Sequence, residues 1–175
     1  MSIKRIADGI MRAAGIVPPV DRASTTLTDG SPVTEDHREL KPNGQQKGYI
    51  VLSAEERAHG FVRPVRDAYV HVGRPAPKGA LRDLADEERK RWGRYGYVKY
   101  EPYPGGEGRF WTQPMLDRVG KGCGTKTTMG RSLAETYARD PGFYGATFCC
   151  GCGAHHPVGA DGEFVWDGTD ERVGT

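Results

Sequence analysis

The residues best suited to chemistry lie between Cys123 and His156, a stretch that holds all four cysteines and two of the five histidines of the chain. Cys149 and Cys152 form a C-x-x-C pair, whose spacing lets a tight turn direct both thiols at one ion. His155 follows at C-x-x-H spacing, and Cys123 supplies a third thiol from a Gly-Cys-Gly turn. Three thiolates and one imidazole make the closed tetrahedral set that zinc prefers. The sequence therefore predicts a structural Zn²⁺ site, with no open position for catalysis.

Other interpretations of these cysteines remain open. Two disulfides would have to use the adjacent Cys149 and Cys150, and no signal peptide points to an oxidising compartment. A redox C-x-x-C normally opens a helix after a βαβ pattern, which is not found here. Cys150 is then a spare thiol. His156 is the alternative to His155 as a ligand, and His155 is preferred for its spacing.

Composition limits the size of the domain that must position these residues. The chain has 175 residues, a hydrophobic fraction of 37%, 25 glycines and 12 prolines, which predicts one domain with a modest core and many loops. A structural zinc contributes roughly 10 kcal/mol or more, comparable with the whole stability of a small domain. A net charge of +2 does not favour a protein driven by nucleic acid, and no apolar run approaches the roughly 18 residues of a membrane span. We expect a soluble protein assembled inside a cell.

Three segments follow from the patterning. Residues 1–15 are predicted to form an amphipathic helix, residues 16–48 an extended Pro/Gly-rich arm, and residues 49–175 an α+β body with the zinc site in residues 123–156. Because the arm has few apolar groups to offset its ordering entropy, we expect it to lie on a partner and to make few contacts with the body. Its anchors would be Ile3, Ile6, Ile10, Val20, Leu27, Val33 and Leu40.

The body is predicted to contain three short helices and several short strands. The helices are expected at residues 53–59, where Ser53 and Glu56 form a capping box, at residues 85–92 and at residues 129–139. The strands are expected at residues 49–52, 61–65, 68–72, 95–103, 143–148 and 163–166. We thus expect a small zinc-stapled α+β fold.

Basic and aromatic residues alternate in one part of the body, between Arg89 and Tyr100. This pattern is typical of surfaces that bind single-stranded nucleic acid. The alternative is a solvated helix followed by a packed aromatic strand, which we favour because four acidic residues accompany five basic ones in residues 84–103. The contacts to nucleic acid would come from Arg89, Arg91, Trp92, Arg94 and Lys99.

Several motifs together resemble a family of small, uncharacterised proteins of tailed bacteriophages and prophages. These motifs are Lys-Gly-Tyr-Ile-Val-Leu-Ser-Ala-Glu-Glu-Arg at residues 47–57, Gly-Phe-Val-Arg-Pro-Val-Arg at residues 60–66, Gly-Arg-Phe-Trp-Thr at residues 108–112, residues 27–38, and nearly all of residues 122–175. The resemblance carries over Cys123, Cys149, Cys152 and His155 as metal ligands. His156 stands where an apolar residue is expected in relatives.

No pattern in the chain indicates an enzyme. His155, His156 and Asp161 lack the further His and Asn ligands that an HNH-type nuclease needs, and no phosphate loop or catalytic triad is found. We expect a non-enzymatic structural or assembly protein of a phage virion, assembled in the host cytoplasm. Its arm would contact other virion proteins. Homo-oligomers of the protein are also compatible with this role. The alternative is a cytoplasmic zinc protein that binds nucleic acid or a host protein.

Overall fold

The computed structural model describes residues 17–175. The helix expected at residues 1–15, with Ile3, Ile6 and Ile10, therefore lies outside the described residues. The helices are η1 (Arg22–Ser24), η2 (Glu35–Arg38), α2 (Ala54–Ala58), α3 (Asp86–Trp92), η3 (Gly93–Tyr95), α4 (Gln113–Asp117) and α5 (Arg131–Arg139), where η marks a 3-10 helix. The strands are β1 (Thr26–Leu27), β2 (Ile50–Val51), β3 (Ala68–His71), β4 (Arg82–Asp83), β5 (Tyr97–Glu101), β6 (Arg109–Thr112), β7 (Lys126–Thr128), β8 (Ala146–Cys149), β9 (Ala154–Pro157) and β10 (Phe164–Trp166).

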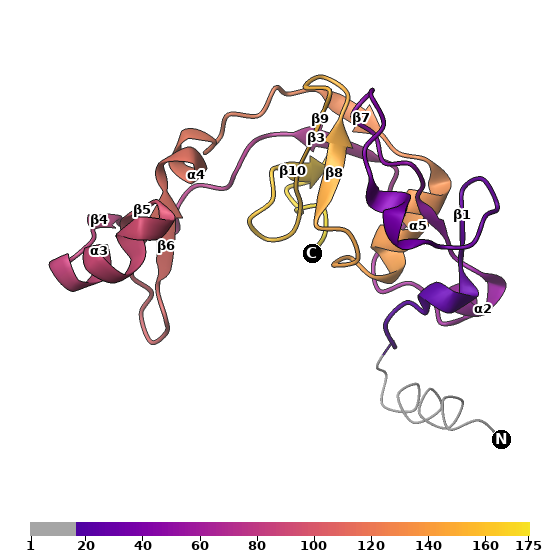
Figure 1. Cartoon of the computed structure of the whole chain (residues 1–175), viewed down its shortest axis with the longest axis horizontal. Coiled ribbons are helices and arrows are strands. Elements are labelled where there is room, and N and C mark those ends of the chain that lie inside the picture. The colour runs from indigo at the N-terminus through magenta and orange to yellow at the C-terminus, as the bar shows by residue number, and fades with distance from the viewer. Residues whose placement is uncertain (1–16) are drawn as a thin grey trace.

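The predicted α+β class is confirmed. The strands pair antiparallel in four small sheets, in the orders β1-β2, β10-β3-β7, β4-β5-β6 and β8-β9. In Figure 1, residues 82–117, which we call the lobe, project from residues 17–81 and 118–175; from here on, the body means these remaining residues and no longer all of residues 49–175. Two extended segments connect the two parts. Within residues 17–175, no helix has the length and apolar character needed to cross a bilayer.

The body is built around an aromatic cluster between the β10-β3-β7 sheet and α5. Tyr69 of β3 contacts Phe164 and Trp166 of β10 edge-on, with ring centroids 5.2 and 6.5 Å apart. Tyr137 of α5 contacts Trp166 in the same way, at 6.1 Å. Edge-to-face pairs are a favoured geometry and add to the free energy of burial. The cluster therefore fixes α5 against β3 and β10.

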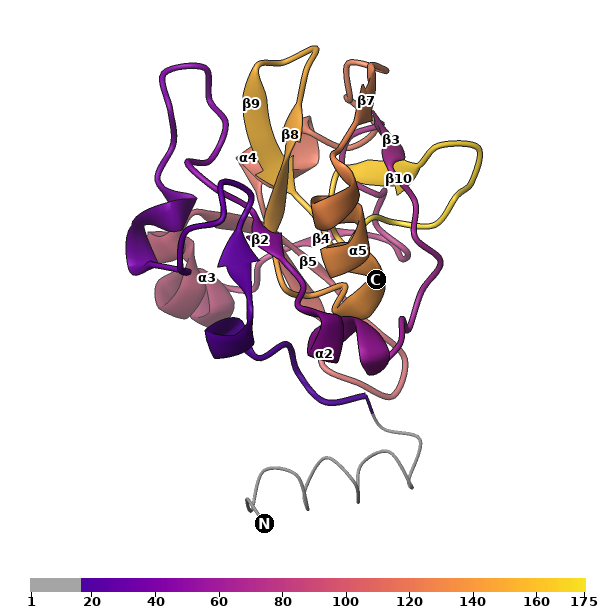
Figure 2. The same cartoon turned by 90° about the vertical axis from the view of Figure 1, so that its right-hand side faces the viewer.

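Helix α5 is buried on nearly all sides, and its charged residues are paired accordingly. Residues 133–139 are all buried, including Glu135 and Arg139. Glu135 binds Arg57 at 2.8 Å and Arg131 at 2.9 Å, while Arg139 lies 3.1 Å from Glu56. Buried charges are tolerated only where they are paired and hydrogen-bonded, as here. Figure 2 shows α2 beside the end of α5, where these pairs form.

The expectation that residues 16–48 make few contacts with residues 49–175 is wrong for the described part, residues 17–48. Strand β1 pairs with β2, so that Leu27 lies opposite Ile50 and is only 7% exposed. Val20 and Val33 also pack against the core. Of the predicted anchors described by the structure, Leu40 alone points to solvent, at 60% exposure. A few well-placed apolar groups and backbone pairing thus suffice to dock this segment on its own chain.

Most elements predicted for residues 49–175 are found, with shifted boundaries. The three expected helices correspond to α2, α3 and α5, and a fourth, α4, was not expected. Residues 61–65 are not a strand: Val62 and Arg63 donate backbone hydrogen bonds to Ala138 at the end of α5, and Phe61 is 41% exposed. The backbone of residues 61–65 therefore caps the C-terminal end of α5 and does not extend a sheet.

Two leucines of the N-terminal segment test whether it belongs to the core. Leu27→Ala should lower the free energy of unfolding by about 2–5 kcal/mol, because it deletes a buried side chain. Leu40→Ala removes the same atoms from an exposed site and should change it by less than about 0.5 kcal/mol. Urea denaturation followed by tryptophan fluorescence measures both. Equal effects of the two substitutions would contradict the docking of this segment.

Candidate metal centre

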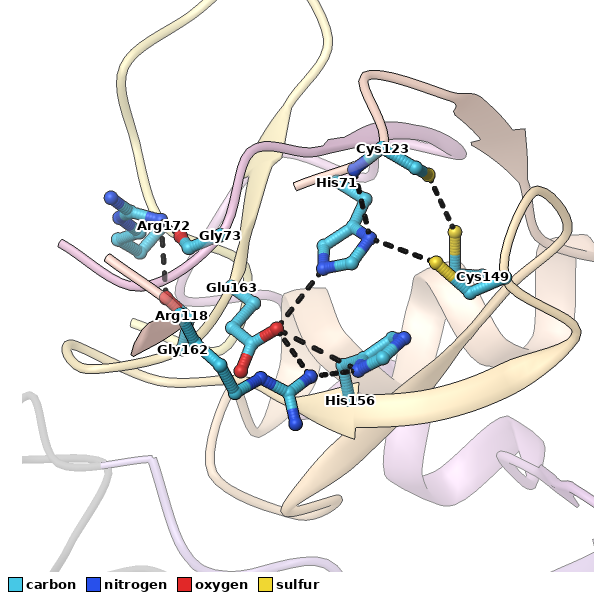
Figure 3. Close-up of polar contacts among 10 residues, drawn as sticks. His71, Gly73, Arg118, Cys123, Cys149, His156, Gly162, Glu163 and Arg172 are labelled. Atoms are coloured by element: carbon cyan, nitrogen blue, oxygen red, sulfur yellow. Dashed lines mark hydrogen bonds and ion pairs between the residues drawn. The ribbon is translucent and has the colours of Figure 1, made fainter. Parts of the chain in front are cut away.

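Four potential ligands converge from separate parts of the body. His71 is the last residue of β3, Cys123 lies in the turn before β7, Cys149 ends β8, and Cys152 lies in the turn between β8 and β9. Their ligand atoms all lie within 4.8 Å of one another, so the four residues could hold a metal ion. Figure 3 shows the thiols of Cys123 and Cys149 directed at one another, with the His71 ring beside them.

The distances suit one tetrahedral ion. The sulfurs of Cys123 and Cys149 are 3.5 Å apart, and the Cys152 sulfur lies 3.3 Å from Nδ1 of His71. With metal–sulfur bonds of about 2.3 Å, a tetrahedral ion separates its sulfur ligands by about 3.8 Å. The ligands therefore need to move only slightly to enclose an ion at their centre.

Two glycines allow the ligand segments to approach this closely. A Cβ at Gly151 would lie 2.1 Å from the Oγ1 of Thr125 and 3.0 Å from the sulfur of Cys123. A Cβ at Gly122 would lie 2.1 Å from the carbonyl oxygen of His71. Any side chain at either position would push the cysteine turns away from each other or from β3. These glycines are thus a structural requirement of the cluster.

A buried carboxylate orients the imidazole of His71. Nε2 of His71 lies 3.0 Å from Glu163, which is 2% exposed at its side chain and also binds Arg118 at 2.7 Å. Burial raises the pKa of Glu163, but hydrogen bonds from His71 and Arg118 outweigh it, so the pKa falls below its usual 4.5. The ionised carboxylate holds the ring proton on Nε2, which leaves the lone pair of Nδ1 facing the sulfurs. Histidine ligands of metals typically show this arrangement.

The pKa values of Cys123 and Cys152 are shifted in opposite directions. Hydrogen bonds from Thr125 lower the pKa of Cys123 to about 6. Burial, followed by hydrogen bonds and repulsion from the other two sulfurs, raises the pKa of Cys152 to about 12. Three thiolates at these distances repel one another strongly, whereas a divalent cation at their centre stabilises all three. The cluster is therefore electrostatically suited to bind a metal ion.

The structure brings together three of the four predicted ligands, and the fourth member is His71 in place of His155. Strand alternation explains the difference. In the β8–β9 hairpin, Cys149 pairs with Ala154, so that Ala154 and His156 share the cysteine face and His155 points to the other. There the His155 ring packs edge-on against Phe148 at 5.5 Å, and burial lowers its pKa.

The alternative ligand, His156, also lies outside the sulfur cluster. Its ring stacks on that of His71 at 4.3 Å, and it joins His71 and Glu163 in a second group that could hold a cation. The guanidinium of Arg118 already binds both Glu163 and His156, and its positive charge opposes a cation there. The spare thiol, Cys150, is exposed. The sulfur cluster is therefore the better candidate.

Sequence spacing alone did not indicate His71. It lies 52 residues before Cys123, in an Ala-Tyr-Val-His-Val strand with no adjacent cysteine. The available signal was the strand itself, because it ends in a histidine and is buried. In addition, Cys123 remains as a further cysteine once the C-x-x-C pair and the spare thiol are counted. Only the pairing of β3 with β7 brings His71 beside the turn of Cys123.

The proposed nucleic-acid residues lie far from this centre, in the lobe. Arg89, Arg91 and Trp92 belong to α3, Arg94 to η3 and Lys99 to β5. Lys99 is paired with Asp83 at 2.7 Å, whereas the guanidinium of Arg91 lies 4.7 Å from the ring centre of Trp92.

Comparisons with family models, with curated proteins and with solved structures found no match for this chain.

Replacement of each of two histidines, in separate variants, tests which residues form the metal centre. His71→Ala should abolish stoichiometric metal binding, because it removes a ligand, whereas His155→Ala should leave the metal content unchanged. Elemental analysis of the purified variants, and cobalt absorption bands in the thiolate charge-transfer region, measure this directly. Retention of metal by His71→Ala with its loss in His155→Ala would restore the ligand set predicted from spacing.

Proposed function

We propose that His71, Cys123, Cys149 and Cys152 bind one structural Zn²⁺. The donor set supports zinc, because three soft thiolates and one imidazole select it over calcium, magnesium or manganese. Four protein ligands complete a tetrahedral shell and leave no position for a catalytic water. The single observation that carries this proposal is the convergence of the four ligand atoms, with Glu163 behind the imidazole.

Such an ion would join two sheets that share no strand. His71 belongs to the β10-β3-β7 sheet and Cys149 to the β8-β9 hairpin. Protein contacts between them include a hydrogen bond from the Tyr69 hydroxyl to the carbonyl of Phe148, at 2.6 Å. One structural zinc contributes roughly 10 kcal/mol or more, which is as large as the net stability of many domains of this size. We infer that the apo protein is largely unfolded or unstable.

We further propose that the protein is a non-enzymatic binding module of a tailed-phage particle. The closed metal centre supports a stabilising role, and the resemblance of residues 47–57, 60–66 and 108–112 to phage proteins supplies the setting. The docked segment 17–48 no longer supports an arm that spreads over neighbours. The projecting part of the molecule is the lobe, and not the N-terminal segment.

Removal of the carboxylate behind His71 tests the zinc proposal without touching a ligand. Glu163→Ala should weaken zinc affinity about 10–100-fold, since the imidazole loses the partner that fixes its orientation. Glu163→Gln keeps a hydrogen-bond acceptor and should weaken it less. Competition with a chromophoric chelator gives both affinities. Unchanged affinity in Glu163→Ala would show that the His71–Glu163 contact does not serve a metal.

The virion proposal has its own test, which does not depend on zinc. Quantitative mass spectrometry of purified particles should find peptides of this protein at a fixed, stoichiometric copy number. Its absence from particles, with abundant protein in the infected cell, would exclude a structural role and favour the alternative of a cytoplasmic zinc-binding protein.

A further inference from the structure

The lobe carries a row of aromatic rings that none of its own residues fully covers. Ring centroids are 6.2 Å apart for Trp92 and Tyr95, 5.6 Å for Trp92 and Phe110, and 5.6 Å for Tyr97 and Phe110. Tyr100 continues the row, 4.9 Å from Phe110. We call these five residues the aromatic strip. Tyr95 is 58% exposed and the other four are partly exposed.

The aromatic strip joins α3 to the sheet of the lobe, since Trp92 of α3 contacts Phe110 of β6, but the fully buried ring of the lobe lies on the opposite face of the sheet. In the β5–β6 pairing, Tyr100 lies opposite Phe110, and Lys99 lies opposite Trp111 on the other face of the sheet. Trp111 is fully buried and donates its indole N–H to the buried Glu101, at 2.9 Å. Within the segment expected to form a packed aromatic strand, Glu101 is buried, whereas Tyr97 and Tyr100 are only partly buried. The rings of the strip are tilted against one another by 42–55°, so they do not cover each other's faces.

Cations without acidic partners border the strip at the end of α3. Within residues 17–175, Arg91 and Arg94 form no ion pair, whereas Lys90 and Lys99 are paired with Glu87 and Asp83. Arg89 donates to the carbonyl of Leu84 and also interacts with Asp83. The guanidinium groups of Arg91 and Arg94 lie 4.7 Å from the ring centres of Trp92 and Tyr95, respectively. No acidic residue occurs between Arg89 and Tyr100 in the sequence. This end of the lobe is thus positively charged, although the whole chain is nearly neutral.

We propose that the aromatic strip and its arginines bind single-stranded nucleic acid. Unpaired bases stack on partly exposed aromatic rings, and each arginine held over a ring presents N–H donors to a phosphate while its plane accepts a base. Complementary charge argues for a polyanion as the occupant, and the tilted rings argue for unstacked bases in place of a duplex. This inference goes beyond the proposed structural zinc and does not depend on the virion setting.

The test is fluorescence anisotropy of a labelled oligothymidine with the full-length, zinc-loaded protein. Wild-type protein should bind the single strand more tightly than a duplex of equal length, and affinity should fall steeply between about 50 and about 200 mM salt. Trp92→Ala should weaken binding about tenfold through the loss of one stacking platform, and Trp92→Phe should recover part of it.

A double charge variant separates binding from folding. Arg91→Ala with Arg94→Ala alters only exposed side chains, and it should make the slope of log affinity against log salt shallower by about 1.4, if each arginine contacts one phosphate. The controls come from the body: Arg66→Ala removes a partly exposed cation that is paired with Glu171, and Phe61→Ala removes an exposed ring. They should bind as the wild type does.

Three results would overturn the proposal. The first is no anisotropy change for the wild type at low salt. The second is equal affinity and salt slope for the wild type and the double arginine variant. The third is an equal loss in the body controls, which would place the binding surface outside the lobe. Zinc content, measured on every variant, keeps a failure of this proposal distinct from a failure of the metal centre.

Discussion

The convergence of three sulfurs and one imidazole is the constraint on which the rest of the body depends. Two thiols 3.5 Å apart gain little free energy from their own contact, so another interaction must bring their segments together. A cation would supply it, and the surrounding structure is arranged accordingly: glycines occur where the turns touch, and a buried carboxylate faces the far nitrogen of the ring. The aromatic cluster of Tyr69, Phe164 and Trp166 lies on the same face of β3 as His71, whose ring centre is 5.0 Å from that of Phe164.

Local patterns predicted much of this structure, and long-range contacts account for the errors. The helices expected at residues 53–59 and 129–139 are found as α2 and α5, because their signals act within a few residues. The cysteines were recognisable for the same reason. Ser53 caps α2 as expected, whereas the Glu56 carboxylate binds Asp21 and Arg139 in place of the Ser53 backbone. His71 was missed because its role depends on strand pairing across 52 residues of sequence. Spacing indicates His155 because it does not reveal that a hairpin turns alternate side chains to opposite faces.

The N-terminal segment shows a different limit. Its composition suggested an arm, since apolar residues are sparse and prolines frequent, and the entropy of ordering appeared hard to offset. Leu27 overcomes this because it adds a strand to β2 and is buried against the core, so backbone hydrogen bonds and one side chain act together. Composition counts apolar residues but does not weigh where they are placed.

The lobe is inserted between two members of the metal cluster, His71 and Cys123. Its two connecting segments meet where they leave the body: Arg74 and Val119 form a bridge, and Gly120 donates to the carbonyl of Arg74 at 3.0 Å. The entry and exit points are thus held side by side by the body, independently of what lies between them. A different insert, or a short loop, would join the same two points of the body without displacing His71 or Cys123.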